Sequence, residues 1–357
     1  MSAARRLRDK QQMTLIPVTV LTGFLGSGKT TLLNHLLAQP GLSDTAVIIN
    51  EFGAVGLDHL LVRKVAEDVV LLQSGCLCCT VRGDLVEGMR DLFLKRVKGE
   101  VPEFARVVIE TTGLADPAPI IHTLMTDPLI SSRYKLDGIV ATIDAVNGER
   151  SLNAQMEAVK QVAVADRLIL TKVDIADPTQ VEVLRARLRG LNPAAPIIPV
   201  AMGRVNPDDI LDAGLFNKES KLPDVARWLN EEAYAAHQAA QGGHHHHHDR
   251  NRHDAHIQAF VFTATEPVSW AALGFALELM ISSKGENLLR IKGIVNARES
   301  EVPLAIHGVQ HVFHPPAPLP GWPDEDHRTR IVFITRDLGR EMVEELLKGV
   351  LSLEALN

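Results

Sequence analysis

The chain has 357 residues, 46% of them hydrophobic, and its 37 basic and 44 acidic residues give a net charge of −7. This length predicts two or three domains, because single cores of this size usually split. The acidic balance argues against a surface devoted to nucleic acid, and no apolar run reaches the roughly 18–20 residues that span a bilayer. Residues 1–13 carry basic side chains without a following apolar core, so we expect a disordered tail, not a signal peptide, on a cytoplasmic protein.

Short apolar runs alternate with helical patterns through the first 222 residues. Helix-period segments such as Lys29–Ala38 and Thr179–Leu191 lie between runs that read as strands buried on both faces. This alternation predicts an α/β domain over residues 14–222, with a mostly parallel sheet flanked by helices. The expected strands are Ile16–Leu21, Ala46–Asn50, Val69–Gln73, Arg106–Glu110, Gly138–Asp144, Arg167–Thr171 and Pro196–Val200.

The composition changes after this domain. Residues 223–256 are expected to hold an amphipathic helix, starting near Leu222 and ending near Gln241, and then a His-rich linker or loop. Residues 257–357 predict a smaller α+β domain of about 100 residues. Its expected strands are Ile257–Val268, Leu288–Asn296, Pro303–Phe313 and Arg330–Leu338, and its expected helices are Ser269–Ser283 and Leu338–Leu353.

The stretch "GFLGSGKT" matches the phosphate-loop pattern GxxxxGK[ST]. In that pattern Gly23 and Gly28 let the backbone N–H groups surround the phosphates, while Lys29 reaches the outer phosphates. The hydroxyl of Thr30 is expected to ligate Mg²⁺. The stretch follows a predicted strand and opens a predicted helix, which disfavours the alternative of a glycine-rich turn that binds nothing. The pattern alone leaves GTPase, ATPase and kinase open.

The stretch "LTKVD" bears on the choice of base. Asp174 ends a late strand, where it can accept two hydrogen bonds from the edge of guanine, and adenine has no such donors. Lys172 can lay its stem along the base. Thr171 occupies the position of the usual asparagine, which weakens the guanine assignment. The alternative is an ordinary turn with a helix cap at Asp174 or Asp177.

Acidic residues follow several of the predicted strands. Glu110 is expected to hold Mg²⁺ through water or to orient an attacking water, and the N–H of Gly113 to meet the γ-phosphate. Glu51 and Asp58 follow the second strand and could move with nucleotide state. Asp144 is either structural or close to the nucleotide. For Glu51, Asp58 and Glu110 the alternative is a polar residue where a strand meets a loop.

All cysteines of the chain, Cys76, Cys78 and Cys79, lie within four positions. In a reducing compartment such a cluster favours metal or redox chemistry over a disulfide, and a buried apolar cluster is the alternative. An extended backbone turns Cys79 away from the other two, so all three converge only if the chain turns there. Three thiolates leave tetrahedral Zn²⁺ one ligand short, which suits a metal that is handed on. Cu(I) and Co²⁺ also accept such ligands.

A histidine run lies between the two domains and predicts a weak metal collector. An affinity tag or a solvated loop are the alternatives, and the mid-chain position disfavours a tag. The run comprises His244, His245, His246, His247 and His248, with His253 and His256 after it. No role is assigned to His307, His311 and His314.

Several segments, in chain order, resemble the CobW/YjiA family of P-loop GTPases. They are "TGFLGSGKTTLLNHLL", "NEFGAVGLD", "SGCLCC", "IETTGLADPAPII", "LDGIVATIDAVN" and "ADRLILTKVD". In the second domain "LLRIKGIVN", "HGVQHVF" and "RIVFI" resemble the family's C-terminal domain. The resemblance covers nearly the whole chain from Thr14, and threonine in place of asparagine in "TKVD" also occurs within the family.

The resemblance implies a GTPase that binds GTP and Mg²⁺ and carries a transition metal. It implies base contacts from Lys172 and Asp174, a Mg²⁺-side carboxylate at Glu110 and a switch carboxylate at Glu51. The implied phosphate and Mg²⁺ contacts are Gly23, Gly26, Ser27, Gly28, Lys29, Thr30 and Thr31. The implied metal ligands are Cys76, Cys78 and Cys79.

The sequence therefore leads to the hypothesis of a GTP-hydrolysing metallochaperone. Zinc is the first choice of metal and cobalt the second, and the expected partner is a client metalloprotein or a metal-insertion enzyme, not nucleic acid or a membrane. The oligomeric state stays open, with a nucleotide- or metal-dependent dimer as one option. Two alternatives remain: a His-rich metal store with a vestigial GTPase, and an ATP-dependent small-molecule kinase.

Overall fold

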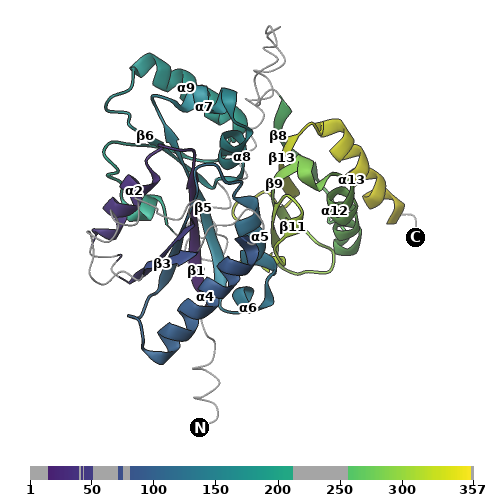
Figure 1. Ribbon diagram of the computed structural model, residues 1–357. Helices are drawn as coiled ribbons and strands as arrows, with labels where there is room; N and C mark the ends of the chain where they lie inside the picture. The colour runs from purple at the N-terminus through teal and green to yellow at the C-terminus, as the bar shows by residue number, and fades with distance from the viewer. Residues whose placement is uncertain are drawn as a thin grey trace.

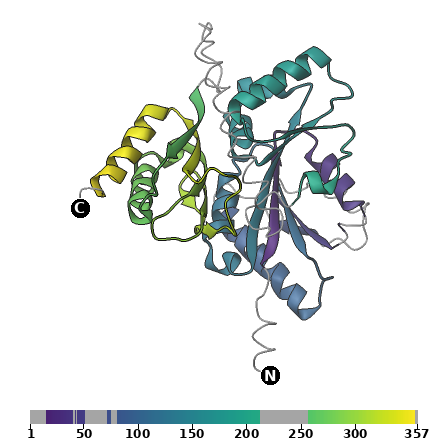
Figure 2. The same cartoon turned by 180° about the vertical axis from the view of Figure 1, so that it is seen from behind.

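The computed structural model describes residues 15–39, 42, 44–50, 71–74, 81–211 and 256–354. These residues form two bodies, each built on its own β-sheet, which lie side by side in both views (Figures 1 and 2). No helix within the described ranges is long and apolar enough to cross a membrane.

The first sheet has seven strands in the order β3-β2-β4-β1-β5-β6-β7, and every pairing along it is parallel. The strands are β1 (Ile16–Gly23), β2 (Thr45–Asn50), β3 (Leu71–Ser74), β4 (Arg106–Thr111), β5 (Tyr134–Asp144), β6 (Arg167–Thr171) and β7 (Ile197–Val200). This confirms the α/β class with a largely parallel sheet.

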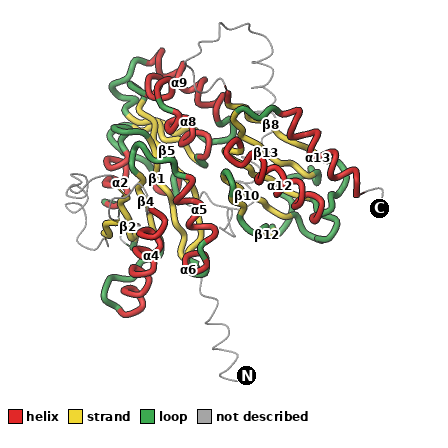
Figure 3. Tube along the Cα trace, turned by 45° about the vertical axis from the view of Figure 1, so that its right-hand side comes forward, coloured by secondary structure: helices red, strands yellow, loops and turns green. Residues whose placement is uncertain are grey.

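Helices cover both faces of this sheet, and the strand residues alternate between the two. On β5, Val140 packs with the helix α2 (Lys29–Leu37), while its neighbours Ile139 and Ala141 face the opposite layer. The helices are α2 (Lys29–Leu37), α4 (Val81–Lys98), α5 (Ala118–Thr126), α6 (Pro128–Ser131), α7 (Gly148–Ala154), α8 (Met156–Val164) and α9 (Pro178–Leu191), with a 3₁₀ turn η2 (Pro207–Asp209). Both layers are visible around the central strands in Figure 3.

The second sheet is antiparallel, in the order β11-β10-β9-β13-β8, with β12 paired to β10. Its strands are β8 (Ile257–Ala264), β9 (Leu288–Val295), β10 (Leu304–Val309), β11 (Val312–Phe313), β12 (Ala317–Pro318) and β13 (Thr329–Arg336). The helices α12 (Trp270–Lys284) and α13 (Arg340–Glu354) lie on its outer face, and η4 (Gly285–Asn287) precedes β9 (Figure 1). The predicted α+β character is therefore confirmed.

One strand prediction in this body is wrong. Pro303–Phe313 was expected to run as a single strand, but the chain reverses at Gln310, whose φ of 51° is left-handed. The residues on both sides of the turn favour a strand, so the sequence pattern does not show the turn. The left-handed position carries glutamine, which is not a typical turn residue. The result is a tight β10–β11 hairpin.

The two bodies share a hydrophobic core. On β13, Ile331 and Phe333 face α12 and α13, while Val332 and Ile334 join a cluster with α8 and α9 of the first body. The hairpin makes a second contact, because Val309 and Val312 are buried in the cluster around α5. The second sheet is thus enclosed between its own helices and those of the first body.

Candidate functional site

The phosphate loop joins β1 to α2, and its backbone depends on glycine. Gly28, directly before α2, has a φ of 93°, in the left-handed region that suits glycine. Gly23 has a φ of 138°, and a Cβ there would lie 2.3 Å from the hydroxyl of Thr142. Both glycines of the sequence pattern are therefore required by the local geometry.

The side chains of Lys29 and Thr30 lie where the loop opens a pocket. Lys29 is buried, and its Nζ donates to the carbonyl oxygens of Gly23 (2.8 Å) and Phe24 (3.2 Å), folding back over the loop. The hydroxyl of Thr30 donates to Oε1 of Glu110 at 3.1 Å. Residues separated by 80 positions in the chain thus meet at the carboxyl edge of the sheet.

The described residues line a pocket of about 400 Å³ at this edge. The lining comprises Leu25, Gly26, Gly28, Lys29, Thr30, Thr31, Asn34, Glu110, Thr111, Thr112, Gly113, Leu114 and Lys172. Gly113 approaches the phosphate loop so closely that a Cβ on it would lie 2.6 Å from the backbone nitrogen of Leu25. Ser27 differs from its neighbours, since its hydroxyl turns to that of Thr142 at 2.6 Å.

Hard oxygen donors for Mg²⁺ are present in this pocket. The Thr30 hydroxyl and the Glu110 carboxylate adjoin one another, and Glu110 is only 5% exposed. Mg²⁺ prefers oxygen ligands and commonly takes one or two protein groups beside phosphate oxygens. The donor set therefore fits this ion. Elsewhere, no group of three or more His, Cys, Asp or Glu side chains that could hold a metal occurs among the described residues.

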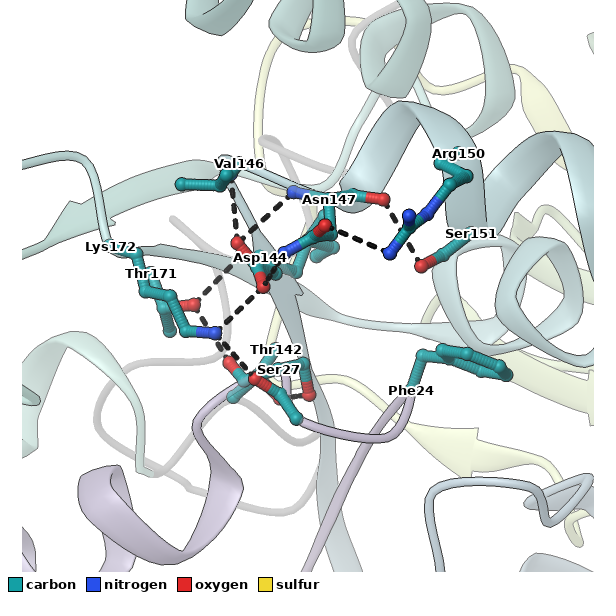
Figure 4. A network of polar contacts seen from close by, with 12 residues as sticks. Phe24, Ser27, Thr142, Asp144, Val146, Asn147, Arg150, Ser151, Thr171 and Lys172 are labelled. Atoms are coloured by element: carbon teal, nitrogen blue, oxygen red, sulfur yellow. Dashed lines mark hydrogen bonds and ion pairs between the residues drawn. The ribbon is translucent and has the colours of Figure 1, made fainter. Parts of the chain in front are cut away.

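A polar network ties the end of β6 to the phosphate loop (Figure 4). The hydroxyl of Thr171 lies 2.7 Å from the carbonyl of Ser27 and 3.1 Å from that of Ile143. Nζ of Lys172 donates to the carbonyl of Gly26 (2.8 Å) and to Oδ2 of Asp144 (2.7 Å). Lys172 holds this position with a left-handed φ of 58°.

Asp144 is the anionic centre of this network. Burial opposes ionisation of its carboxyl, but hydrogen bonds from Lys172 and Asn147 outweigh that effect and lower its pKa. The backbone N–H groups of Val146 and Asn147 also donate to Oδ1, at 2.8 and 3.2 Å. Of the two interpretations of Asp144, structural or close to the nucleotide, the geometry supports a residue that fixes Lys172 above the loop.

Asp174 lies exposed just beyond β6. The helix cap belongs instead to Asp177, whose Oδ1 accepts from the N–H groups of Thr179 (2.9 Å) and Gln180 (3.0 Å) at the start of α9. Asp174 is therefore free of the capping role that was its structural alternative.

Sequence reasoning missed two contributors to the site. It treated Thr171 only as a departure from the usual asparagine, whereas its hydroxyl tethers the phosphate loop to β6. It also assigned nothing to the loop after β7, where Gly203 lies so close to Thr31 that a Cβ would be 2.8 Å from its carbonyl oxygen. The available signal was position, because ligands bind at the carboxyl ends of parallel strands.

Several predicted site residues lie outside the described ranges. They are Glu51, Asp58, Cys76, Cys78, Cys79, His244, His245, His246, His247, His248 and His253. The strands that precede Glu51 and the cysteines are described. β2 ends at Asn50 and β3 ends at Ser74, and these two residues are paired in parallel register. The chain therefore leaves toward Glu51 and toward Cys76 from adjacent points on the sheet edge that carries Glu110.

A parallel sheet with a phosphate loop after its first strand, and with Thr30 beside Glu110, defines a P-loop nucleotide-binding protein. The family model "CobW/HypB/UreG, nucleotide-binding domain" matches residues 17–199, and the model "Cobalamin synthesis protein cobW C-terminal domain" matches residues 257–351. The chain belongs to the CobW/HypB/UreG family, which confirms the resemblance found in the sequence.

Curated relatives match across nearly the whole chain. The chain is 34% identical to the zinc chaperone YjiA of Escherichia coli K12, over 95% of this chain and 99% of that protein. It is 30% identical to the zinc chaperone CobW of Pseudomonas aeruginosa, over 94% and 92% of the two chains. The crystal structure of Zn(II)-bound YjiA GTPase from E. coli superposes with a TM-score of 0.69 at 29% identity, covering 95% and 99% of the two chains.

Proposed function

We propose that this protein is a GTP-hydrolysing metallochaperone that couples its nucleotide state to the binding and delivery of zinc. The observation that carries the nucleotide part is the meeting of Thr30 and Glu110 beside the buried Lys29 in one pocket. The metal part is supported by the relatives, since YjiA and CobW are named zinc chaperones and the solved YjiA is named a GTPase with Zn(II) bound.

In this proposal each side of the pocket has its own task. Lys29 exchanges its two carbonyl partners for the outer phosphates, and the N–H of Gly113 meets the γ-phosphate. Thr30 and Glu110 hold Mg²⁺, which neutralises charge on the phosphates when bound. Glu110, or Glu51 from the neighbouring loop, orients the attacking water. Gly23, Gly26, Ser27, Gly28 and Thr31 supply the remaining phosphate-side contacts.

The base is assigned to the end of β6. Asp174 is exposed and does not cap α9, so its carboxylate is available to accept from the guanine edge. The stem of Lys172 crosses the phosphate loop to reach Gly26, which sets it beside the nucleotide. A carboxylate at this position selects GTP over ATP, because adenine lacks the paired donors of guanine.

Zinc is the proposed cargo, and Cys76, Cys78 and Cys79 are its proposed ligands, with cobalt as the second choice of metal. Asn50 and Ser74 end paired strands, so the chain continues to Glu51 and to Cys76 from neighbouring points of the sheet. A change in the γ-phosphate region could thus alter both. The recipient would be a client metalloprotein or metal-insertion enzyme, in the cytoplasm. The histidine run His244–His248 would act as a weak secondary collector, and a nucleotide- or metal-dependent dimer is compatible with the scheme.

The deciding experiment is an anaerobic competition titration of Zn²⁺, Co²⁺ and Ni²⁺ with GTP, GDP or ATP present. Thermodynamic linkage requires GTP to change metal affinity by the same factor as metal changes GTP affinity. We expect tighter zinc binding with GTP than with GDP and no effect of ATP. Equal metal affinity in the GTP and GDP states would contradict the proposed coupling.

Two variants separate the thiolate site from the histidine run. Replacing all three cysteines, Cys76, Cys78 and Cys79, with serine should remove tight zinc binding and leave GTP binding largely intact. Deleting residues 242–256 should leave one tight site and remove weak capacity. If tight binding survives the serine variant and disappears with the deletion, the protein is a metal store and the chaperone proposal fails.

A further inference from the structure

The loop between β4 and α5, residues 112–117, is held by groups that do not belong to the phosphate-binding motifs. Its first half, Thr112 to Leu114, lines the same pocket as Lys29. Gln161 on α8 is 1% exposed, and its Nε2 lies 3.3 Å from the carbonyl of Gly113 and 3.0 Å from that of Ala115. The proposed γ-phosphate contact is therefore fixed from behind by a buried side chain.

The second half of the loop is held through Asp116. Its Oδ1 accepts from the N–H of Ala118 at 3.0 Å, which joins it to the start of α5. Its Oδ2 accepts from Nζ of Lys160 at 2.7 Å and from Nε2 of Gln310 at 3.2 Å. Lys160 belongs to α8, but Gln310 belongs to the second body, 194 positions away in the chain.

Gln310 lies in a turn whose flanking residues are buried. It occupies the left-handed turn of the β10–β11 hairpin, between Val309 and Val312, which are 2% and 5% exposed. Both valines pack in the cluster that contains Ile120, Ile121 and Leu124 of α5. The hairpin is thus anchored in the core of the nucleotide-binding body, directly beside the helix that the loop leads into.

We propose that Gln310 is a positioning residue for GTP hydrolysis, through which the C-terminal domain holds the Gly113 loop in its reactive arrangement. The inference rests on the proposed function, because it assumes that Gly113 meets the γ-phosphate. GDP lacks that phosphate, so a residue that acts through this loop affects hydrolysis and leaves GDP affinity nearly unchanged. A small misplacement of a group that contacts the transferred phosphate is enough to slow the reaction.

The test uses the full-length chain with three substitutions of Gln310. Gln310→Gly removes the amide and suits the left-handed backbone, so strain does not confuse the result. Gln310→Asn keeps the amide and tolerates that backbone, but its side chain is one methylene too short. We expect both to lower kcat for GTP by about three- to tenfold, with KM and the affinity for a fluorescent GDP changed by less than about twofold. Gln310→Glu removes the Nε2 donor to Asp116 and should lower kcat as well.

A control at the neighbouring residue separates positioning from general disturbance of the turn. His311→Ala alters the exposed neighbour in the same turn and should hydrolyse GTP like the unaltered protein. Unchanged kcat in Gln310→Gly, or an equal loss of kcat in His311→Ala, would each overturn the inference. Absence of turnover in the unaltered protein would overturn the proposed function together with it.

Discussion

At the scale of single residues, Thr171 links the end of β6 to the phosphate loop. Its hydroxyl, buried at the end of β6, donates to the phosphate loop through the carbonyl of Ser27 or to Ile143. Since valine has the same shape without the hydroxyl, Thr171→Val isolates this bond. We expect affinity for both GTP and GDP to fall by about three- to tenfold, measured by fluorescent-nucleotide titration. The exposed Thr179→Val on α9 is the control, and equal behaviour of the two variants would refute the tether.

Lys29 is the second residue whose role can be isolated. In the structure its ammonium group is buried against carbonyl oxygens, and bound phosphates would take over as its partners. Lys29→Ala should lower kcat by about 100-fold or more, because transition-state charge on the phosphates loses its nearest cation. Phosphate release under saturating GTP measures this. Lys98→Ala, on the exposed end of α4, should keep normal turnover, and normal turnover in Lys29→Ala would contradict the assignment of the loop.

The difference between these residues shows what a sequence can predict about a site. The phosphate loop is a local motif, so residues 23–30 can be recognised from their spacing and from the adjoining strand and helix. The bond from Thr171 spans 144 positions and depends on the registers of β5 and β6, which no local pattern encodes. The contact between Asp116 and Gln310 was not predicted for the same reason, because these residues lie 194 positions apart in the chain.

At the scale of elements, β10 carries a buried histidine toward the domain interface. His307 pairs across the sheet with Lys292 of β9 and is 6% exposed. Burial and the charges of Arg290 and Lys292 lower its pKa well below the ordinary value, although Asp166 acts in the opposite direction and His314 adds to the lowering. The native protein therefore holds this imidazole neutral under conditions in which the unfolded chain would bind a proton.

The sign of the pH effect follows from this. Below about pH 6.5 the unfolded state binds a proton at His307 that the native state does not bind. The free energy of unfolding therefore decreases as the pH falls from about 6.5 toward the lowered native pKa of His307. The decrease is at most about 1.4 kcal/mol per pH unit. His307→Leu should make the free energy of unfolding, measured with urea at pH 7 and pH 5, less dependent on pH. The exposed His311→Leu should leave that dependence unchanged. Equal slopes for His307→Leu and the unaltered protein would disprove the prediction.

The strands and turns also show which elements can be predicted from sequence patterns and which cannot. Buried strands such as β1, β5 and β6 were found because each contains a short, mostly apolar run that ends at polar residues. The β10–β11 turn was not predicted because its left-handed residue is Gln310. A glycine or asparagine at this position would have indicated a turn. The packing of neighbouring valines against α5 supports that conformation, and this tertiary effect is invisible to local propensity.

At the scale of the whole molecule, one buried charge cluster crosses the interface between the two bodies. Asp166 lies between α8 and β6, and its Oδ1 accepts from both Arg290 and Lys292 of β9. Its Oδ2 accepts from the N–H of Ile139 at 2.9 Å. Burial alone would raise the pKa of Asp166, but the two cations outweigh it and hold the pKa far below the ordinary value.

The cluster therefore favours a joined arrangement of the domains whenever Asp166 is ionised. The pKa is depressed in the native state, so the stabilisation is complete above the unfolded value of about 3.9 and is lost only as the pH falls below it. At neutral pH the loss of this carboxylate would leave two cations buried without their counter-ion. Such a loss is costly, since an uncompensated buried charge cannot regain its hydration.

Asp166→Asn should thus lower the free energy of unfolding at pH 7 by about 3–5 kcal/mol. Asparagine keeps the size of the side chain and an oxygen that can accept from Ile139, so the change isolates the charge. Guanidinium unfolding, followed by tryptophan fluorescence, would measure it. Asp91→Asn removes one partner of an exposed pair with Lys95 and should have a much smaller effect. Equal stability changes in the two variants would show that the interface depends on its shared apolar core, with Val332 and Ile334 against α8 and α9, and not on the buried charges.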